Sequence, residues 1–217
     1  MNGRKNSVAN TKSMKPIAKY SGHTSTVTDV AWHQLHTTIF ASATSEGQFG
    51  LWDIRSGDTS RPSHMVEGHK FSIKCVEFNP FSEYLLSTSS TDRSIALWDL
   101  RNLKLKLHSI RVREELFHRI RWSPHYASLL GACNNDRRIY LFDLDRLFEE
   151  QTPDDADDGP PSLLFSHNGH TSPIYDLSWN PNDELMICSV SEDNIVQIWQ
   201  VVSLNTTTDN LLISTTY

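Results

Sequence analysis

The chain has 217 residues, of which 38% are hydrophobic, and a formal net charge of -6 at pH 7. This length can bury one sizeable core, and the modest acidic balance argues against direct, general binding of nucleic acid. No apolar run approaches the length that crosses a membrane, so no membrane contact is expected. The three cysteines, Cys75, Cys133 and Cys188, are scattered and no secretory segment is recognised, so we expect reduced thiols in an intracellular protein.

Residues 1–20 form a basic tail that differs from the rest of the chain. Its charged residues are all positive: Arg4, Lys5, Lys12, Lys15 and Lys19. Such a tail could be an arm for nuclear targeting or for an anionic surface, or a solvated and disordered segment. The composition favours the disordered segment.

One spacing recurs four times beyond this tail. A gap of 29 residues joins the members of four pairs: His23 and Trp52, His69 and Trp98, Arg113 and Phe142, His170 and Trp199. An aromatic residue stands nine residues after each start (Trp32, Phe78, Trp122, Trp179), and an acid stands six residues before each end (Glu46, Asp92, Asp136, Asp193). Gly-His near the start and Trp-Asp at the end of a repeat of about 40 to 45 residues are typical of a WD-repeat propeller blade.

The sequence therefore predicts an all-β fold, a WD-repeat β-propeller with four recognisable blades within residues 21–203. The four units are 21–55, 66–101, 110–145 and 167–202, and a C-terminal tail, 204–217, follows them. In the second unit, residues 73–78 alternate between apolar and polar as a half-buried strand does. A second strand begins at 84–86 and a third covers 95–98, with a tight turn at 91–94 between them.

The repeated histidines and acids predict a structural hydrogen-bond relay in each blade. In WD-repeat proteins the histidine resembles a buried link between the turn acid, the strand tryptophan and a hydroxyl, because an imidazole can donate from one nitrogen and accept at the other. The expected sets are His23, Glu46 and Trp52; His69, Asp92 and Trp98; His170, Asp193 and Trp199, with Ser42, Thr88 and Ser189 as candidate hydroxyls. The third unit has Arg113 and Phe142 instead, so we expect no relay and a weaker blade there.

Catalytic and metal-binding patterns are not recognised in the sequence. It has no Gly-rich phosphate loop, no nucleophile elbow and no paired-cysteine metal site. Two His-x-x-His pairs, His33 with His36 and His167 with His170, have no further ligands nearby, and structural zinc sites use four. We therefore expect a protein that is not an enzyme and that needs no cofactor or metal.

An acidic insertion, 149–161, interrupts the regular spacing. Successive units start 46, 44 and 57 residues apart, and the extra length falls here. The insertion has six acids, and the apolar residues 163–165 follow it. Because insertions in propellers form surface loops, an acidic loop beside an apolar patch suits a basic amphipathic helix. A solvated spacer without a partner is the alternative.

Three stretches, 97–109, 149–165 and 187–195, resemble the retinoblastoma-associated histone-binding WD-repeat family. The similarity covers about residues 22–200. Members of that family are nuclear, non-enzymatic subunits of histone acetyltransferase, chromatin-assembly, deacetylase, remodelling and Polycomb complexes. The resemblance implies a nuclear scaffold whose partners are core histones and subunits of chromatin-modifying complexes. It further implies that the insertion grips a histone helix through Asp154, Asp155, Asp157, Asp158, Gly159, Pro160, Pro161 and Phe165.

The chain departs from that family in three ways. The family propeller has seven blades and an N-terminal helix that forms the other wall of the histone groove, whereas this chain resembles only the four C-terminal blades. Ser166 replaces an apolar residue of the groove floor. The family also binds basic tails through top-face acids, but the positions three and five residues after each start have none: Thr26, Thr28, Ser72, Lys74, Leu116, His118, Pro173 and Tyr175. Glu192 is the acid that remains at a top-face position.

Four blades also raise a packing problem, since an incomplete ring leaves two apolar blade faces exposed. Three arrangements are open: an open arc, a closed four-bladed ring, and a dimer that forms an eight-bladed ring. A truncated product without a function is a further possibility.

A second functional hypothesis is a substrate receptor or scaffold of a cullin-type ubiquitin ligase. The segments 52–55 and 98–101 resemble the Trp-Asp-x-Arg motif by which some propellers dock to the ligase adaptor. Arg55 and Arg101 would then be the docking residues. The motif has low specificity because Trp-Asp already belongs to the fold, and an arginine after a strand is most often a solvated charge.

Overall fold

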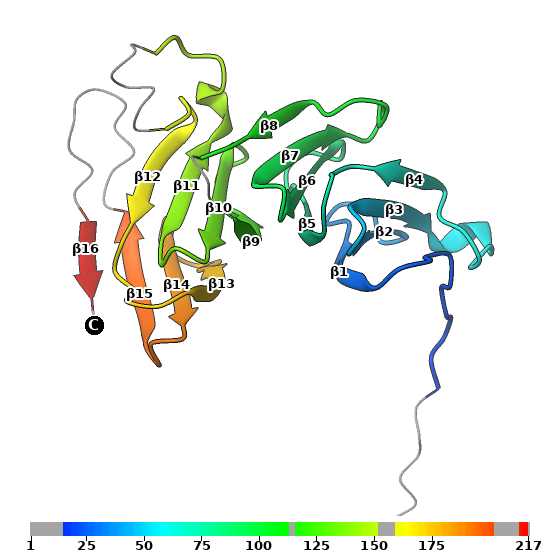
Figure 1. The fold of residues 1–217 in the computed structure, drawn as a ribbon, viewed down its shortest axis with the longest axis horizontal. Helices are drawn as coiled ribbons and strands as arrows, with labels where there is room; N and C mark the ends of the chain where they lie inside the picture. The colour runs from blue at the N-terminus through cyan, green and yellow to red at the C-terminus, as the bar shows by residue number, and fades with distance from the viewer. Residues whose placement is uncertain (1–14, 113–115, 152–158, 202–212, 217) are drawn as a thin grey trace, which may run out of the picture.

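Four antiparallel sheets of four strands each make up the computed structural model, which describes residues 15–112, 116–151, 159–201 and 213–216 (Figure 1). The first two sheets contain β1 (Val27–Trp32), β2 (Ile39–Thr44), β3 (Gln48–Asp53) and β4 (His64–Glu67), then β5 (Ile73–Phe78), β6 (Leu85–Ser90), β7 (Ser94–Asp99) and β8 (His108–Ile110). The other two contain β9 (Phe117–Trp122), β10 (Leu129–Asn134), β11 (Ile139–Asp143) and β12 (Leu163–His167), then β13 (Ile174–Trp179), β14 (Met186–Ser191), β15 (Val196–Val201) and β16 (Ile213–Thr216). The predicted all-β fold is confirmed.

Each sheet is a meander whose strands pair in sequence order. The three strands predicted for the second unit correspond to β5, β6 and β7, but every sheet also has a fourth strand that the prediction did not include. β4 and β8 begin in the segments between the predicted units, β12 follows the acidic insertion, and β16 lies in the predicted C-terminal tail. Short 3-10 helices, η1 (Ile54–Ser56) and η2 (Leu144–Arg146), follow β3 and β11.

The turn between the second and third strands has the same backbone conformation in every blade. The residue 24 positions after each repeat start has a positive φ: Gly47 (83°), Arg93 (66°), Arg137 (65°) and Asn194 (64°). At Gly47 a Cβ would lie 2.2 Å from the carbonyl oxygen of His69, so this turn has room for glycine alone. The acid of each repeat precedes this residue directly, and the shared turn therefore presents the acids in a comparable way.

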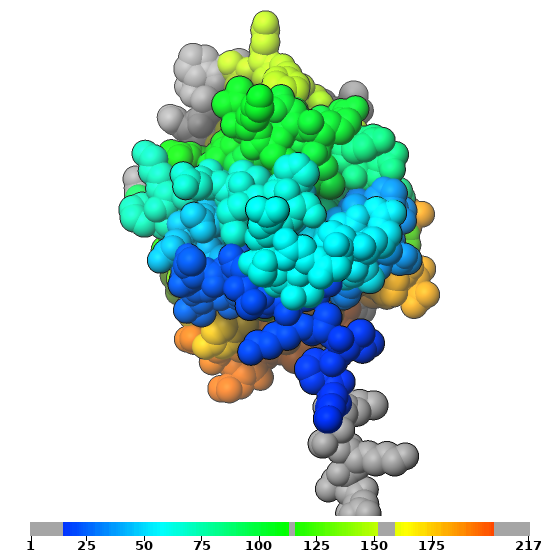
Figure 2. All heavy atoms as spheres, turned by 90° about the vertical axis from the view of Figure 1, so that its right-hand side faces the viewer, coloured from blue at the N-terminus to red at the C-terminus, as the bar shows by residue number. Residues whose placement is uncertain are grey.

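The sheets are arranged as the blades of an open arc. The first strands lie side by side, with β1 against β5, β5 against β9, and β9 against β13. The first and fourth blades stand at the two ends of the arc (Figure 1), and among the described residues no strand pairing joins them. In a view of the first-blade end, residues of the first unit and the segment that follows it form the near surface (Figure 2). The chain is therefore not a closed four-bladed ring.

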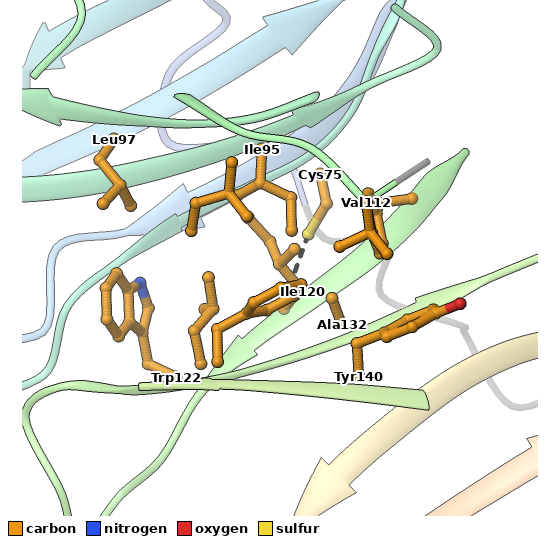
Figure 3. Packing of buried hydrophobic residues seen from close by; sticks show 12 residues of the cluster. Cys75, Ile95, Leu97, Val112, Ile120, Trp122, Ala132 and Tyr140 are labelled. Carbon is orange, nitrogen blue, oxygen red and sulfur yellow. Dashed lines mark hydrogen bonds between the residues drawn. The ribbon is translucent and has the colours of Figure 1, made fainter. Parts of the chain in front are cut away.

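The hydrophobic cores lie between neighbouring blades. One core joins the first and second blades around Phe49 and Phe78, and another joins the third and fourth around Trp179 and Trp199. In the central core, Ile95 and Leu97 of the second blade face Ile120 and Trp122 of the third (Figure 3). Each blade is therefore stabilised mainly by the burial of its faces against its neighbours. No helix among the described residues is long and apolar enough to cross a membrane.

Candidate functional site

The second blade contains a complete hydrogen-bond relay. His69 Nδ1 lies 2.9 Å from Asp92 Oδ2, His69 Nε2 lies 2.7 Å from Thr88 Oγ1, and Trp98 Nε1 donates to the same oxygen at 2.9 Å. Because an ionised carboxylate only accepts, Nδ1 of His69 must carry a proton, and the Thr88 hydroxyl then donates to Nε2. Asp92 also accepts from the backbone N–H of Lys70 at 3.3 Å and of Ser94 at 3.1 Å. The relay thus connects two strands and two turns.

Burial and pairing set the charges of this relay. Desolvation lowers the pKa of His69 below its ordinary value, and the hydrogen bond that His69 donates to Asp92 only partly offsets that effect. Burial also opposes ionisation of Asp92, but hydrogen bonds from His69 and Ser94 hold the pKa of this carboxyl well below its usual range. At neutral pH the pair is therefore a neutral imidazole bound to a carboxylate.

The relay of the first blade lacks its acid. His23 Nε2 lies 2.5 Å from Ser42 Oγ, and Trp52 Nε1 donates to that oxygen at 2.7 Å. Glu46, however, is exposed, and the buried Nδ1 of His23 has no partner. The prediction that Glu46 completes this relay was wrong. Glutamate has one methylene more than the aspartates of the other blades, and its carboxylate lies in solvent instead of at the imidazole.

In the fourth blade the tryptophan is present but does not take part in the relay. His170 bonds Asp193 at 3.0 Å and Ser189 at 2.8 Å, as predicted. Nε1 of Trp199 is buried without a hydrogen-bond partner, which corrects the predicted contact. His167 instead stacks on the indole of Trp199, with ring centroids 4.6 Å apart.

The third blade has apolar side chains in place of the relay. The hydroxyl position is Ala132 and the tryptophan position is Phe142, and both are fully buried. Phe142 packs beside Tyr140 and edge-on to Phe117, so an aromatic cluster fills this space. Arg113, which replaces the histidine, lies outside the described residues.

The candidate histone-binding loop is described at its two ends only. Asp154, Asp155, Asp157 and Asp158 lie outside the described residues. At the base of the loop, Gly159, Pro160 and residues 163–166 line a shallow groove of about 190 Å³ together with Gln151. The side chain of Gln151 donates to the Gly159 carbonyl at 3.1 Å and closes the loop. Phe165 is half-buried, and its ring lies 6.4 Å from that of Trp199.

Phe148 is a candidate contact that the repeat pattern did not reveal. Its side chain is 85% exposed, and the exposed acids Glu149 and Glu150 follow it. Arg146 binds Glu149 at 2.8 Å and holds the start of the loop against the blade. An aromatic residue at the end of the repeat, directly before an acidic run, was the available signal in the sequence.

The top face has little capacity for a basic tail. Glu192 is exposed, but it accepts a short hydrogen bond from the hydroxyl of Tyr175. Tyr175 itself occupies one of the positions where the resembled family has acids. The Glu192 carboxylate therefore already has a partner within the protein, and Lys74 is exposed at another of these positions. Both features make this face a poor site for lysine-rich or arginine-rich segments.

A charged network across the first strands was also not predicted. Arg121 lies 3.7 Å from Glu77 and 3.6 Å from Asp176, and Arg119 lies 3.5 Å from Asp29. Glu77 accepts the backbone N–H of Trp122 at 2.8 Å. Burial raises the pKa of Glu77 to about 7, although Arg121 acts in the opposite direction. The two arginines of the third blade thus contact acids of the first, second and fourth blades.

The two arginines of the Trp-Asp-x-Arg segments are engaged locally. Arg55 forms a two-pronged pair with Asp53, and Arg101 forms the same pair with Asp99, at 2.6 and 2.7 Å for the shortest contacts. These pairs lower the pKa of each aspartate to about 2. Arg101 also covers the ring of Tyr84 at 4.6 Å. The guanidinium groups therefore already brace the ends of their strands.

The cysteines and the paired histidines have structural surroundings. All three cysteines are free, and burial raises the pKa of Cys133 to about 12. Nε2 of His33 donates to the Glu83 carbonyl at 3.1 Å, while Nδ1 accepts two backbone N–H groups. Both ring nitrogens of His170 belong to its relay. Among the described residues no group of three or more His, Cys, Asp and Glu could hold a metal ion.

Comparison with known protein families gives a match to the WD domain, G-beta repeat, at residues 14–53, 60–99 and 161–200. These segments contain most of the first, second and fourth blades. The first three strands of the third blade, β9, β10 and β11, lie outside these matches, in agreement with the loss of the histidine, hydroxyl and tryptophan positions in that blade. The matched segments cover more than half of the chain, and they coincide with blades whose histidines bind their hydroxyls as described above. The chain belongs to the WD-repeat family, whose repeats support a role in protein–protein interaction.

Proposed function

We propose that this protein is a non-enzymatic chromatin scaffold of the nucleus that binds core histones through the acidic insertion. The observation that carries the proposal is the groove at the base of that loop. Its lining includes a half-buried aromatic residue, Phe165, and the exposed acids Glu149 and Glu150 directly precede its lining residue Gln151 in the sequence. The resemblance of 149–165 to the histone-binding family supports the same surface.

The chemistry of the loop suits a basic amphipathic helix. Four aspartates within eight residues, 154–161, can pair with lysine or arginine, and arginine can bind a carboxylate through two hydrogen bonds. Phe165 and Phe148 would supply apolar anchors, because aromatic side chains in a groove contribute most to the lifetime of a complex. Charges at the rim mainly affect the association rate and the salt dependence.

The ligase-adaptor hypothesis has less support. Arg55 and Arg101 remain largely exposed, but each guanidinium is bound by the aspartate of its own motif. A docking role would have to break or share these pairs, whereas a strand-end brace explains them directly.

The proposal is tested by binding of the full chain to purified core histones over a range of salt concentrations. Replacing Asp154, Asp155, Asp157 and Asp158 with Asn should weaken binding most at low salt, because screening already weakens these charges at high salt. Phe165→Ala should weaken binding at every salt concentration. Since residues 1–20 do not resemble the family's N-terminal helix, we expect a dissociation constant on the order of micromolar or weaker.

A matched control removes exposed acids far from the loop. Glu46→Gln combined with Glu67→Gln should leave the affinity unchanged. Tight binding that neither loop variant alters would place the histone contact elsewhere. Capture of a ligase adaptor that is lost on Arg55→Ala and Arg101→Ala, with no histone binding, would favour the alternative.

A further inference from the structure

In the first strand of every blade, successive side chains point alternately toward the preceding blade and the following blade. Residues seven and nine positions after a repeat start point to the preceding blade, on what we call the front face. In the three inner cases these are Val76 and Phe78, Ile120 and Trp122, Leu177 and Trp179, and each is at most 8% exposed. Their cores each combine residues of two adjacent blades. The front face is thus buried wherever a preceding blade is present.

Within the described residues, no blade packs on the front face of the first blade. Its equivalent residues, Val30 and Trp32, are 60% and 53% exposed. Isolated exposed apolar residues are common, but these two occupy the positions that carry the core in every other blade. This surface therefore has the apolar side chains that form a junction elsewhere in the chain, but no described residue packs on it as a neighbouring blade does.

The opposite side of a blade, which we call the back face, shows the same pattern at the other end. Residues 26 and 28 positions after the start pack on the following blade: Phe49 and Leu51, Ile95 and Leu97, Ile139 and Leu141 are all at most 7% exposed. Their equivalents in the fourth blade, Val196 and Ile198, are 66% and 48% exposed. Val190 adds to this surface. The arc of described residues therefore ends in an exposed front face and an exposed back face.

Polar contacts of one kind accompany two of the three inner junctions. At the first junction Asp29 accepts the backbone N–H of Val76 at 3.0 Å, and His33 donates to the Glu83 carbonyl at 3.1 Å. At the second junction Glu77 accepts the N–H of Trp122, and Asn79 donates to the Ala127 carbonyl at 2.9 Å. A back-face carboxylate and a polar side chain at the strand end thus accompany the apolar contact.

The fourth blade has both of these polar groups at its free back face. Asp176 is the equivalent of Asp29, and its carboxyl side chain is 46% exposed. Asn180 is the equivalent of His33 and Asn79, and in the single chain its side-chain amide donates to Asp183 at 3.1 Å. The free back face is therefore equipped with the apolar and the polar groups that a front face meets inside the chain.

We propose that the back face of the fourth blade binds the front face of the first blade in a second copy of this chain. Trp32 then packs on Val196 and Ile198, Asp176 accepts the N–H of Val30, and Asn180 donates to the Thr37 carbonyl. A two-fold axis repeats the contact, so that two arcs close into a ring of eight blades. Propellers with up to about eight blades are known architectures, and closed two-fold dimers are the commonest oligomers.

The mass of the full chain in solution tests this inference directly. We expect sedimentation or light scattering at micromolar concentration to give twice the chain mass of 24.8 kDa. Trp32→Asp or Val196→Asp should each raise the dissociation constant at least about thirtyfold, because each places a charge at the centre of both junctions. Leu105→Asp, at a residue that is 75% exposed and lies on neither face, should leave the dimer intact.

Mixing the two variants distinguishes front-to-back pairing from other dimers. The Trp32→Asp chain keeps an intact back face and the Val196→Asp chain keeps an intact front face, so one unaltered junction can form between them. We expect a mixed dimer, detected by native mass spectrometry with one chain labelled with 15N, where each variant alone is a monomer. If either variant loses its cooperative thermal transition, Trp32→Ser and Val196→Ser replace the Asp variants.

Three outcomes would overturn the inference. The first is a wild-type chain that stays monomeric up to about 100 µM, because a specific dimer of this kind should have a dissociation constant below that concentration. The second is a dimer that survives both substitutions. The third is a mixture no more dimeric than its components, since that result indicates pairing of like faces.

Discussion

The second and third blades have the same strand topology, but different interactions stabilise them. The second has the full chain of hydrogen bonds from Trp98 through Thr88 and His69 to Asp92. The third has Ala132 and Phe142 at two of these positions, and an aromatic cluster fills the space. Its strands nevertheless pair in the same order. The relay is therefore not required to form a blade.

This difference shows that two kinds of interaction contribute to the stability of a blade in different ways. Burial of the front and back faces determines that a blade forms at all, and the third blade has a neighbour on both sides. The relay adds a specific link between the turn and the strands, which the first and fourth blades keep only in part. Blades without a complete relay should accordingly depend more on their neighbours.

The largest expected effect separates the second and third blades. Asp92→Ala should lower the free energy of unfolding by about 1–3 kcal/mol, because the buried imidazole of His69 loses its charged partner. Asp136→Ala, in the blade with no relay, should change it by about 0.5 kcal/mol or less, since Asp136 forms a surface pair with Arg138 at 3.6 Å within the described part of the chain. Chemical denaturation of both variants gives the two values, and equal costs would contradict the relay explanation.

The next effect concerns the junction between these two blades. The pKa of Glu77 is about 7, above its ordinary value of 4.5, so the folded state holds this proton more tightly than the unfolded state. The resulting stability is fully present below pH 4.5 and is lost as the pH rises through 7. Glu77→Gln keeps an acceptor for the Trp122 N–H and cannot ionise.

The stability of the Gln variant relative to the wild type should therefore rise by on the order of 1–2 kcal/mol between pH 5 and pH 8. The difference between the two chains removes the contribution of the histidines, which is common to both. Thermal or denaturant unfolding at several pH values measures it. A difference that is constant with pH would show that Glu77 is ionised throughout.

A smaller effect compares the tryptophans of the second and fourth blades. Both indoles are buried, but Trp98 donates to Thr88 whereas the Trp199 N–H has no partner. Trp→Phe removes a similar volume at each site. Trp98→Phe should cost about 1 kcal/mol more than Trp199→Phe, which is the value of one hydrogen bond. Equal losses would indicate that this bond contributes nothing.

The fixed spacing of the repeats predicted the strands and the hydroxyl partners well. Ser42, Thr88 and Ser189 all bind their histidines, because the 29-residue segments share one backbone geometry. The failures at Glu46 and Trp199 have a local cause, since side-chain length and a neighbouring ring decide those contacts. The exposure of Trp32 depends on the absence of a neighbouring blade. A local motif contains no information about that.

The smallest expected effect is a gain in the first blade. Glu46→Asp would bring a shorter carboxylate to the turn position from which Asp92 and Asp193 reach their histidines. The buried Nδ1 of His23, which has no partner now, could then donate to it. We expect a stabilisation of about 0.5–1 kcal/mol in denaturant unfolding. A neutral or destabilising result would mean that the turn of the first blade cannot present the acid.

The proton positions on the imidazoles test the relay most directly. A long-range 15N NMR spectrum of the histidines at neutral pH reports which ring nitrogen carries the proton. His69 should be neutral with the proton on Nδ1, and Nδ1 of His170 should also carry a proton, because Asp92 and Asp193 accept there. Asp92→Ala should remove this signature from His69 and leave His170 unchanged. A proton on Nε2 of His69, or a charged ring at neutral pH, would contradict the account.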